Sequence, residues 1–224
     1  MQEKIDAVLE RMQAACLRAG RKPDEVRLVA VSKTYPPESV REAAECGLRV
    51  FGESRVPEAE AKIPLCPGNL EWELIGHLQR NKVRRALRLF DTIHAVDSLP
   101  LLEKINTAAK ESGKNVKVYL EVNISGEPSK YGLGRDDVLP ILEAATTFMN
   151  VDLAGLMTIP PFSPDPEDAR PYFRKLRELR DELAAASGFG LDELSMGMSG
   201  DFEVAIEEGA ACVRVGSAIF GRRG

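Results

Sequence analysis

Residues 26–33 read Val-Arg-Leu-Val-Ala-Val-Ser-Lys, a mostly apolar run that ends on a serine and a lysine. Its apolar character is nearly continuous rather than alternating, which is typical of a strand that is covered on both faces in a parallel sheet. Similar runs recur along the chain, at residues 26–31, 49–52, 72–76, 92–96, 116–124, 153–159, 193–196 and 212–220. We therefore expect eight buried strands.

The segments between these runs have the periodicity of amphipathic helices, and residues 165–187 form the longest of them. A further helix precedes the first strand and ends at Gly20; its expected apolar face comprises Ile5, Val8, Leu9, Met12 and Cys16. Eight alternating strands and helices in about 200 residues predict a compact (β/α)8 TIM barrel with an extra N-terminal helix. A doubly wound open sheet is the competing fold, but no Gly-x-Gly-x-x-Gly motif follows the first strand.

The composition excludes several classes of protein. The 224 residues carry a net charge of −5, with 44% hydrophobic and 29% charged residues, which is the balance of an ordinary globular protein. The mild acidity argues against broad affinity for nucleic acid or an anionic membrane. No apolar run reaches the roughly 18 residues of a membrane span, and the charged N-terminus lacks the apolar segment of a signal peptide. We expect one domain over residues 1–224, in the cytoplasm, with four free cysteines.

The active site of a parallel barrel lies where its strands end. A polar residue or a glycine follows every predicted strand: Lys33, Glu53 and Ser54, His77, Asp97, Asn123, Thr158, residues 197–199 and residues 216–217. We expect these residues at one mouth of the barrel.

Lys33 is the first candidate for chemistry. A lysine at the end of a buried strand loses hydration, which favours the neutral amine. A neutral amine is the nucleophile that forms a Schiff base with a carbonyl compound. The alternative is a lysine that only extends from its strand into solvent.

Two glycine-containing segments near the C-terminus are candidates for an anion site. Residues 196–201 read Met-Gly-Met-Ser-Gly-Asp, and residues 214–217 read Arg-Val-Gly-Ser. Glycines allow backbone N–H groups to approach an anion, and barrels often hold phosphate after their last two strands. The alternative is that Ser199 or Asp201 caps the next helix. Arg214 lies in an apolar strand, where its guanidinium needs an acceptor from a ligand or from an internal carboxylate.

Three other features of the sequence carry predictions of their own. Residues 80–88 include five basic side chains on an expected helix, which suits a solvated outer face better than a nucleic-acid or protein partner. His77 follows a strand and can contact a ligand at the mouth, whereas His94 lies inside a strand and is interpreted as structural. Two histidines without a carboxylate pattern predict no metal site.

Taken together and in order, these stretches resemble the YggS/PROSC family of pyridoxal phosphate (PLP)-binding proteins, also called PLP homeostasis proteins. The stretches that carry the resemblance are LVAVSKTYP from residue 28, FGESRVPEAEAK from 51, WELIGHLQRNK from 72, IHAVDS from 93, VNISGEPSKYGL from 122, GLMTIPP from 155, LSMGMSGDFEVAIEEGA from 194 and VRVGSAIFG from 213. They span nearly the whole chain. One position departs from the family pattern, because Ser54 stands where these proteins usually have asparagine.

The resemblance implies a fold-type III PLP barrel, similar to the N-terminal domain of alanine racemase but without that enzyme's second, β-rich domain. It implies that Lys33 forms the internal aldimine with PLP. It also implies that the phosphate is held at Ser199–Gly200 and Gly216–Ser217. Arg214 would face the pyridine nitrogen, and a fixed cation there disfavours protonation of the ring and so restrains carbanion chemistry. We add His77 as a candidate contact to the cofactor.

The implied function is PLP (vitamin B6) homeostasis. The chain would hold PLP as a Schiff base without robust turnover and with no catalytic residue, as a monomer that supplies PLP-dependent apoenzymes. A PLP-dependent racemase or decarboxylase acting on a small amino acid is the alternative, although the chain is too short for the second domain of a racemase. A cofactor-free aldolase that uses Lys33 on a sugar phosphate is a third possibility.

Overall fold

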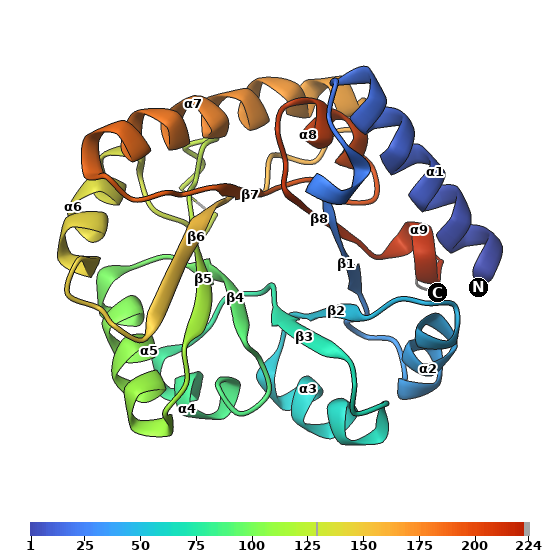
Figure 1. The fold of residues 1–224 in the computed structure, drawn as a ribbon, viewed down its shortest axis with the longest axis horizontal. Helices are drawn as coiled ribbons and strands as arrows, with labels where there is room; N and C mark the ends of the chain where they lie inside the picture. Colours follow the sequence, from blue (N-terminus) through green and yellow to red (C-terminus); the bar gives the residue numbers. More distant parts are fainter. Residues whose placement is uncertain (129, 222–224) are drawn as a thin grey trace.

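The computed structural model describes residues 1–128 and 130–221, and within them eight parallel strands form a closed barrel in chain order (Figure 1). The strands are β1 Arg27–Val31, β2 Val50–Glu53, β3 Glu71–Leu74, β4 Thr92–Val96, β5 Val116–Glu121, β6 Val151–Met157, β7 Glu193–Ser195 and β8 Cys212–Val215. Pairing of β8 with β1 closes the ring. The predicted TIM barrel is confirmed.

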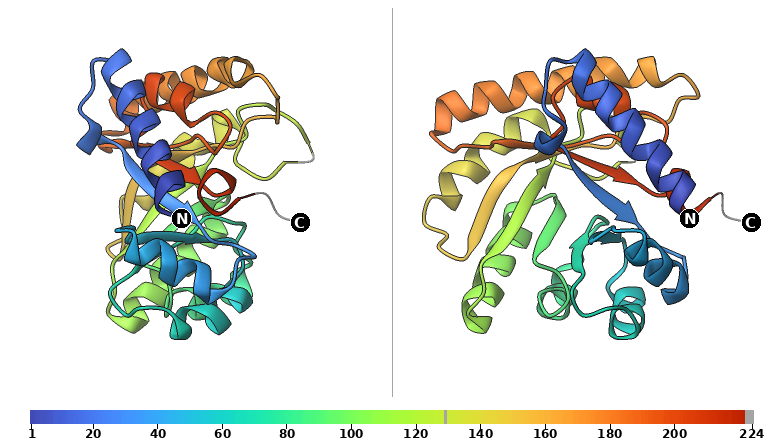
Figure 2. Two further views of the ribbon diagram at one scale, coloured as in Figure 1. Left: turned by 90° about the vertical axis from the view of Figure 1, so that its right-hand side faces the viewer. Right: turned by 45° about the vertical axis from the view of Figure 1, so that its right-hand side comes forward.

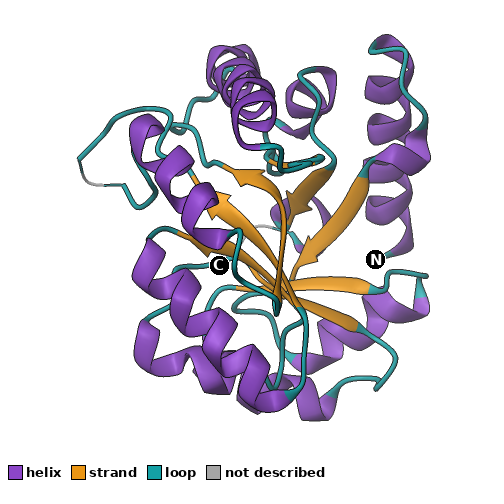
Figure 3. Cartoon of the chain, turned by 60° about the vertical axis from the view of Figure 1, so that its left-hand side comes forward, coloured by secondary structure: helices purple, strands orange, loops and turns teal. Residues whose placement is uncertain are grey.

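Helices surround the barrel on its outer side (Figure 3). The α-helices are α1 Gln2–Arg18, α2 Pro37–Glu45, α3 Val56–Lys62, α4 Val83–Ala86, α5 Leu99–Ser112, α6 Arg135–Ala145, α7 Arg170–Ser187, α8 Phe202–Glu207 and α9 Ser217–Phe220. The short 3-10 helices are η1 Pro23–Glu25, η2 Ile63–Leu65, η3 Arg80–Lys82 and η4 Pro166–Ala169. The large apolar core lies where the helices pack on the strands.

Continuous burial explains why the strands appear in the sequence as apolar runs. All five residues of β4 and all four of β8 are buried, because helices cover one face and the barrel interior covers the other. Two predicted elements need correction. The run 212–220 is not one strand, since β8 ends at Val215 and the apolar residues after Gly216 form α9. The basic segment 80–88 is not one helix but η3 followed by the single turn of α4.

The extra N-terminal helix lies outside the ring, against α8 and α9 (Figure 2). Its buried face includes Ile5, Val8 and Met12, as the periodicity predicts. Leu9 does not belong to that face, since 44% of its surface is exposed. The helix ends before Gly20, which has a φ of +66°. No helix in the described part of the chain combines the length and the apolar character that crossing a membrane requires.

Polar side chains from alternate strands bond across the barrel interior, on the side where the strands begin. Arg27 of β1 pairs with Glu73 of β3 and donates a hydrogen bond to the Tyr119 hydroxyl of β5. Tyr119 in turn donates to Glu193 of β7. Side chains from alternate strands commonly share a layer inside such barrels. This network makes the interior a closed core rather than a channel.

His94 of β4 belongs to the same interior and is structural, as interpreted from the sequence. One ring nitrogen lies 2.6 Å from a Glu73 oxygen, and the other lies 2.8 Å from the Ser195 hydroxyl. Burial lowers the pKa of His94 well below its ordinary value, helped by the positive charge of Arg214. The ligand atoms of Glu73, His94 and Cys212 lie within 4.8 Å of one another. Both imidazole nitrogens have partners in the structure, so these three side chains form part of the polar barrel interior.

Candidate functional site

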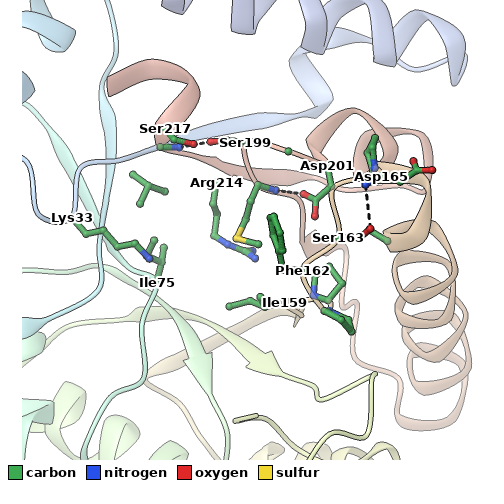
Figure 4. Close-up of a pocket in the computed structure, with 18 residues that line it drawn as sticks. Lys33, Ile75, Ile159, Phe162, Ser163, Asp165, Ser199, Asp201, Arg214 and Ser217 are labelled. Carbon is green, nitrogen blue, oxygen red and sulfur yellow. Dashed lines mark hydrogen bonds between the residues drawn. The ribbon is translucent and has the colours of Figure 1, made fainter. Parts of the chain in front are cut away.

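A cavity of about 650 Å³ opens at the mouth of the barrel where the strands end (Figure 4). Its walls come from the ends of β1 and β8 and from the loops that follow β6 and β7. The fold brings six of the seven predicted site residues to this cavity: Lys33, Ser199, Gly200, Arg214, Gly216 and Ser217. These residues are up to 184 positions apart in the chain, and the barrel topology places them together.

Lys33 lies on the turn that leaves β1. The Tyr35 N–H donates to the Ser32 carbonyl at 3.0 Å, so Lys33 occupies the second position of a tight turn. Its half-buried side chain extends into the cavity past Ile75 (Figure 4). Tyr35 is held elsewhere, with its hydroxyl donating to the Gly221 carbonyl at 2.6 Å and its ring stacked on Phe220. Tyr35 is therefore not a proton donor or acceptor across the cavity from Lys33.

The two glycine-containing segments lie side by side and are tied together by Ser199. Its hydroxyl oxygen accepts hydrogen bonds from the N–H groups of Gly216, at 3.1 Å, and Ala218, at 3.3 Å. The alternative of helix capping is not observed for α8 in this described segment, because Asp201 accepts instead from the N–H of Met198, at 2.6 Å. Ser199 thus joins the β7 and β8 loops into one wall.

This wall has the donors that a phosphate needs. Within residues 1–128 and 130–221, the backbone N–H groups of Ser199, Gly200 and Ser217 donate to no protein acceptor. Gly216 fits closely here, since an added Cβ would lie 3.1 Å from the Val31 carbonyl oxygen. Unpaired N–H groups at glycine-containing turns favour an anion. The residues present therefore fit the phosphate end of PLP, as Lys33 fits its aldehyde end.

Arg214 is almost completely buried, with 3% of its surface exposed. It donates to the Ser195 hydroxyl and, at 3.0 Å, to the Thr158 carbonyl. No carboxylate of the described residues forms a salt bridge with it, so its acceptors are neutral oxygens. Burial lowers the pKa of Arg214, but a guanidinium remains charged at neutral pH. The cavity therefore holds a fixed positive charge (Figure 4).

His77 does not line this cavity. Its Nδ1 lies 2.9 Å from an Asp97 oxygen, and its ring stacks on Tyr131 at 4.2 Å. Tyr131 and Glu121 line a second cavity of about 210 Å³, and Ile159 borders both cavities. The role of His77 as a cofactor contact stays a prediction, since the imidazole is held by Asp97 and Tyr131 and does not line the main cavity.

Two residues of interest were not among the site residues predicted from the sequence. Glu121 ends β5 in a buried position, where burial and the nearby Asp97 raise its pKa to about 7. Phe162 is 96% exposed and yet lines the main cavity. It belongs to the proline-rich loop 159–166, where the Ser163 hydroxyl donates to Asp168 at 2.6 Å. The position of its aromatic ring depends on how this loop folds over neighbouring elements, which no local sequence pattern predicts.

Comparison with known proteins agrees with this geometry. A family model described as the N-terminal domain of alanine racemase matches residues 4–224. The pyridoxal phosphate homeostasis protein of Aquifex aeolicus is 47% identical over 222 residues, which cover 99% of this chain and 97% of that protein. This chain belongs to the PLP homeostasis protein family. The human PLP homeostasis protein is 40% identical over 235 residues, covering 98% of this chain and 85% of the human protein.

Solved structures with the same fold include a protein that is similar to this chain in sequence and an enzyme that is not. PipY of Synechococcus elongatus, in a structure with PLP bound, is 39% identical with a TM-score of 0.84, covering 96% of this chain and 100% of that one. An alanine racemase of Clostridium difficile has a TM-score of 0.74 at 14% identity and shares only the fold. This chain spans 57% of the length of that racemase, while it matches PLP homeostasis proteins almost end to end.

Proposed function

We propose that this member of the PLP homeostasis protein family binds PLP through Lys33 and supplies it to other proteins. One observation carries the proposal: a lysine, a wall of unpaired N–H donors and a buried arginine surround one cavity of about 650 Å³. PLP has an aldehyde at one end, a phosphate at another and a ring nitrogen, so each of these groups has a complementary partner. When bound, PLP supplies an electrophilic carbonyl and an electron-withdrawing ring.

Each residue has a definite part in binding. Lys33 would hold the aldehyde end of PLP, since its Nζ is the cavity amine that can condense with an aldehyde, its two N–H protons leaving with the aldehyde oxygen as water. The N–H groups of Ser199, Gly200 and Ser217 hold the phosphate oxygens. Arg214 would lie on the side of the ring nitrogen and disfavour its protonation, since a second positive charge beside a buried guanidinium is costly.

A carrier fits this site better than an enzyme does. Racemisation requires a second acid–base group across the substrate from the lysine. Tyr35 is turned away from the cavity, and Asp201 is engaged by the N–H of Met198. We propose further that the barrel acts as one domain over residues 1–224, of which 222–224 lie outside the described residues. The same proposal includes a cytoplasmic monomer whose recipients are PLP-dependent apoenzymes.

The test is a transfer experiment with purified protein. The protein is loaded with PLP, freed of excess cofactor, and checked for a visible absorption band that borohydride removes. It is then mixed with a PLP-dependent enzyme that lacks its cofactor, and recovery of that enzyme's activity is followed. We expect the band and the recovery. A protein that PLP does not colour would contradict PLP binding and favour the aldolase.

The alternative enzyme has its own signature. A racemase would exchange the α-proton of an amino acid for deuterium when incubated in deuterated water, whereas a decarboxylase would release carbon dioxide and place deuterium where the carboxylate had been. We expect no such exchange above the rate with free PLP. Exchange that depends on Lys33 would replace the carrier with an enzyme.

A further inference from the structure

We propose that a charge cluster of buried Lys62, buried Glu53 and half-buried Glu58 is a positioning device that holds the turn carrying Lys33. The inference rests on the proposed role of Lys33 in binding PLP. The three residues come from the end of β2 and from α3, so they reach the β1 turn from a neighbouring unit of the barrel. None of them is among the residues that line the main cavity in the described chain.

Lys62 is the centre of the cluster and is only 5% exposed. Its ammonium group donates to the Ser32 carbonyl at 2.8 Å, to Glu53 Oε1 at 2.7 Å and to Glu58 Oε1 at 2.9 Å. An ammonium group has three protons, so these contacts use all of them. The geometry of the ammonium thus fixes a backbone carbonyl and two carboxylates relative to one another.

The cluster contacts the chain on both sides of Lys33. Before it, the Ser32 hydroxyl donates to Glu53 at 2.7 Å, and the Ser32 carbonyl accepts from Lys62. After it, the Thr34 N–H donates to Glu58. The charge cluster therefore holds the backbone on both sides of Lys33, and so sets the direction of its side chain, through contacts with Ser32 and Thr34.

This turn needs such support because Thr34 has a φ of +70°. The third position of a turn with positive φ favours glycine, and a β-branched residue there is strained. Strained backbone persists only where surrounding contacts hold it. The hydrogen bond from the Thr34 N–H to Glu58 is made by the strained residue itself, so it can hold the strained backbone in place.

Stability alone does not account for the arrangement. Glu53 is fully buried, and within the described chain its Oε2 is without a hydrogen-bond partner. Burial raises the pKa of Glu53, against the opposing effect of Lys62. An unpartnered buried carboxylate oxygen costs stability. The structure keeps Glu53 despite this loss of stability, and its hydrogen bonds to the turn that carries Lys33 explain why.

The test compares two glutamates of the same helix. Glu58→Ala removes the acceptor for Thr34, whereas Glu60→Ala removes a glutamate of α3 that pairs with Arg85 on the outer surface. In the protein without PLP, we expect faster hydrogen exchange at the Thr34 amide in Glu58→Ala only. When PLP is added, we expect its bond to Lys33 to form about tenfold more slowly, the ratio at the lower end of the range for one hydrogen bond to a charged group.

Rescue separates positioning from a general loss of structure. Thr34→Gly in the Glu58→Ala background removes the strain, so we expect the rate of bond formation to return toward that of the wild type. If Glu58→Ala does not fold, Glu58→Gln serves instead, with a smaller expected slowing. Wild-type rates in the Glu58 variants, or no recovery with glycine, would overturn the positioning role. Failure of the wild type itself to bond PLP would overturn the proposed function instead.

Discussion

Glu121 shows how burial sets the charge of a single residue at the mouth of the barrel. It is 7% exposed, and its pKa is raised to about 7 from an ordinary 4.5, first by burial and then by Asp97. The folded protein therefore binds a proton at Glu121 more tightly than the unfolded chain does. The resulting stabilisation is complete below pH 4.5 and is lost as the pH rises through 7.

Substitution of Glu121 by glutamine is predicted to stabilise the protein at high pH. Glutamine has no charge to bury, so the gain at pH 8 is expected to be about 1–3 kcal/mol, shrinking toward zero at pH 5. Urea unfolding of both proteins at the two pH values measures it. A gain that is equal at both pH values, or a loss at pH 8, would contradict the origin of the effect in ionisation.

The sequence pattern pointed to Lys33 and the serine–glycine pairs because they follow apolar runs, and to Arg214 because it lies inside one. Their parts in binding PLP came from the family resemblance. The sequence pattern did not predict the raised pKa of Glu121, since that depends on how deeply β5 is covered. Nor did it predict the contacts of His77. A residue after a strand is known to be at the mouth, but its direction depends on Asp97 and Tyr131 from two other loops.

The loop 159–166 lines the main cavity with most of its residues. Proline residues restrict its backbone, and Asp165 accepts from the Glu167 N–H at 3.0 Å to fix its far end. The same loop presents Phe162 to solvent at the cavity wall. A ring at this position is able to cover the open side of a bound planar cofactor.

Removal of that ring is predicted to expose bound PLP. In Phe162→Ala we expect hydroxylamine to remove PLP roughly 2–10 times faster than in the wild type, the range that corresponds to one aromatic contact. Met149→Ala is a suitable control, because Met149 is 83% exposed and does not line the cavity. Equal rates in all three proteins would show that the loop does not cover the cofactor.

Helices α7 and α8 are joined by a buried carboxylate. Glu208, at the end of α8, pairs with Arg170, Arg174 and Arg177 of α7. Burial by itself would raise the pKa of Glu208, but the arginines hold it below 4.5. Its stabilising effect is therefore present above pH 4.5 and is lost as the pH falls through the lower folded value.

Glu208→Gln is predicted to cost about 1–2 kcal/mol of stability at pH 7, a modest value because the arginines are partly exposed and screened. At pH 3 the difference between the variant and the wild type is expected to shrink. Denaturant titrations at both pH values measure it. If the variant and the wild type differ in stability as much at pH 3 as at pH 7, the effect of glutamine comes from altered packing and not from the loss of the charge.

At the scale of the whole molecule, the barrel was predictable because most strand residues are buried, whichever face of the sheet they are on, so the strands appear as apolar runs. The run 212–220 was predicted as one strand, because apolar residues that pack inward from a short helix give the same sequence pattern as a buried strand. The cluster around Lys62 was not predictable either. It depends on tertiary contacts between the turn after β1 and the helix after β2, which no local pattern records.

Binding of PLP is predicted to stabilise the whole fold, because its site joins loops from opposite ends of the chain. At a free PLP concentration one hundred times the dissociation constant, the gain is about 2.7 kcal/mol. For a chain of this size that corresponds to a rise of roughly 5–10 °C in the melting temperature. Calorimetry with and without PLP measures it. An unchanged melting temperature in a protein shown to carry PLP would mean that bound PLP does not connect these loops.

The central claim is that Lys33 is the residue that holds PLP, and peptide mapping tests it most directly. The loaded wild-type protein is reduced with borohydride, digested and analysed by mass spectrometry. The phosphopyridoxyl group is predicted on the peptide that contains Lys33, and on no peptide at that position in Lys33→Ala. A wild-type protein labelled at another lysine, with Lys33 unmodified, would contradict the account.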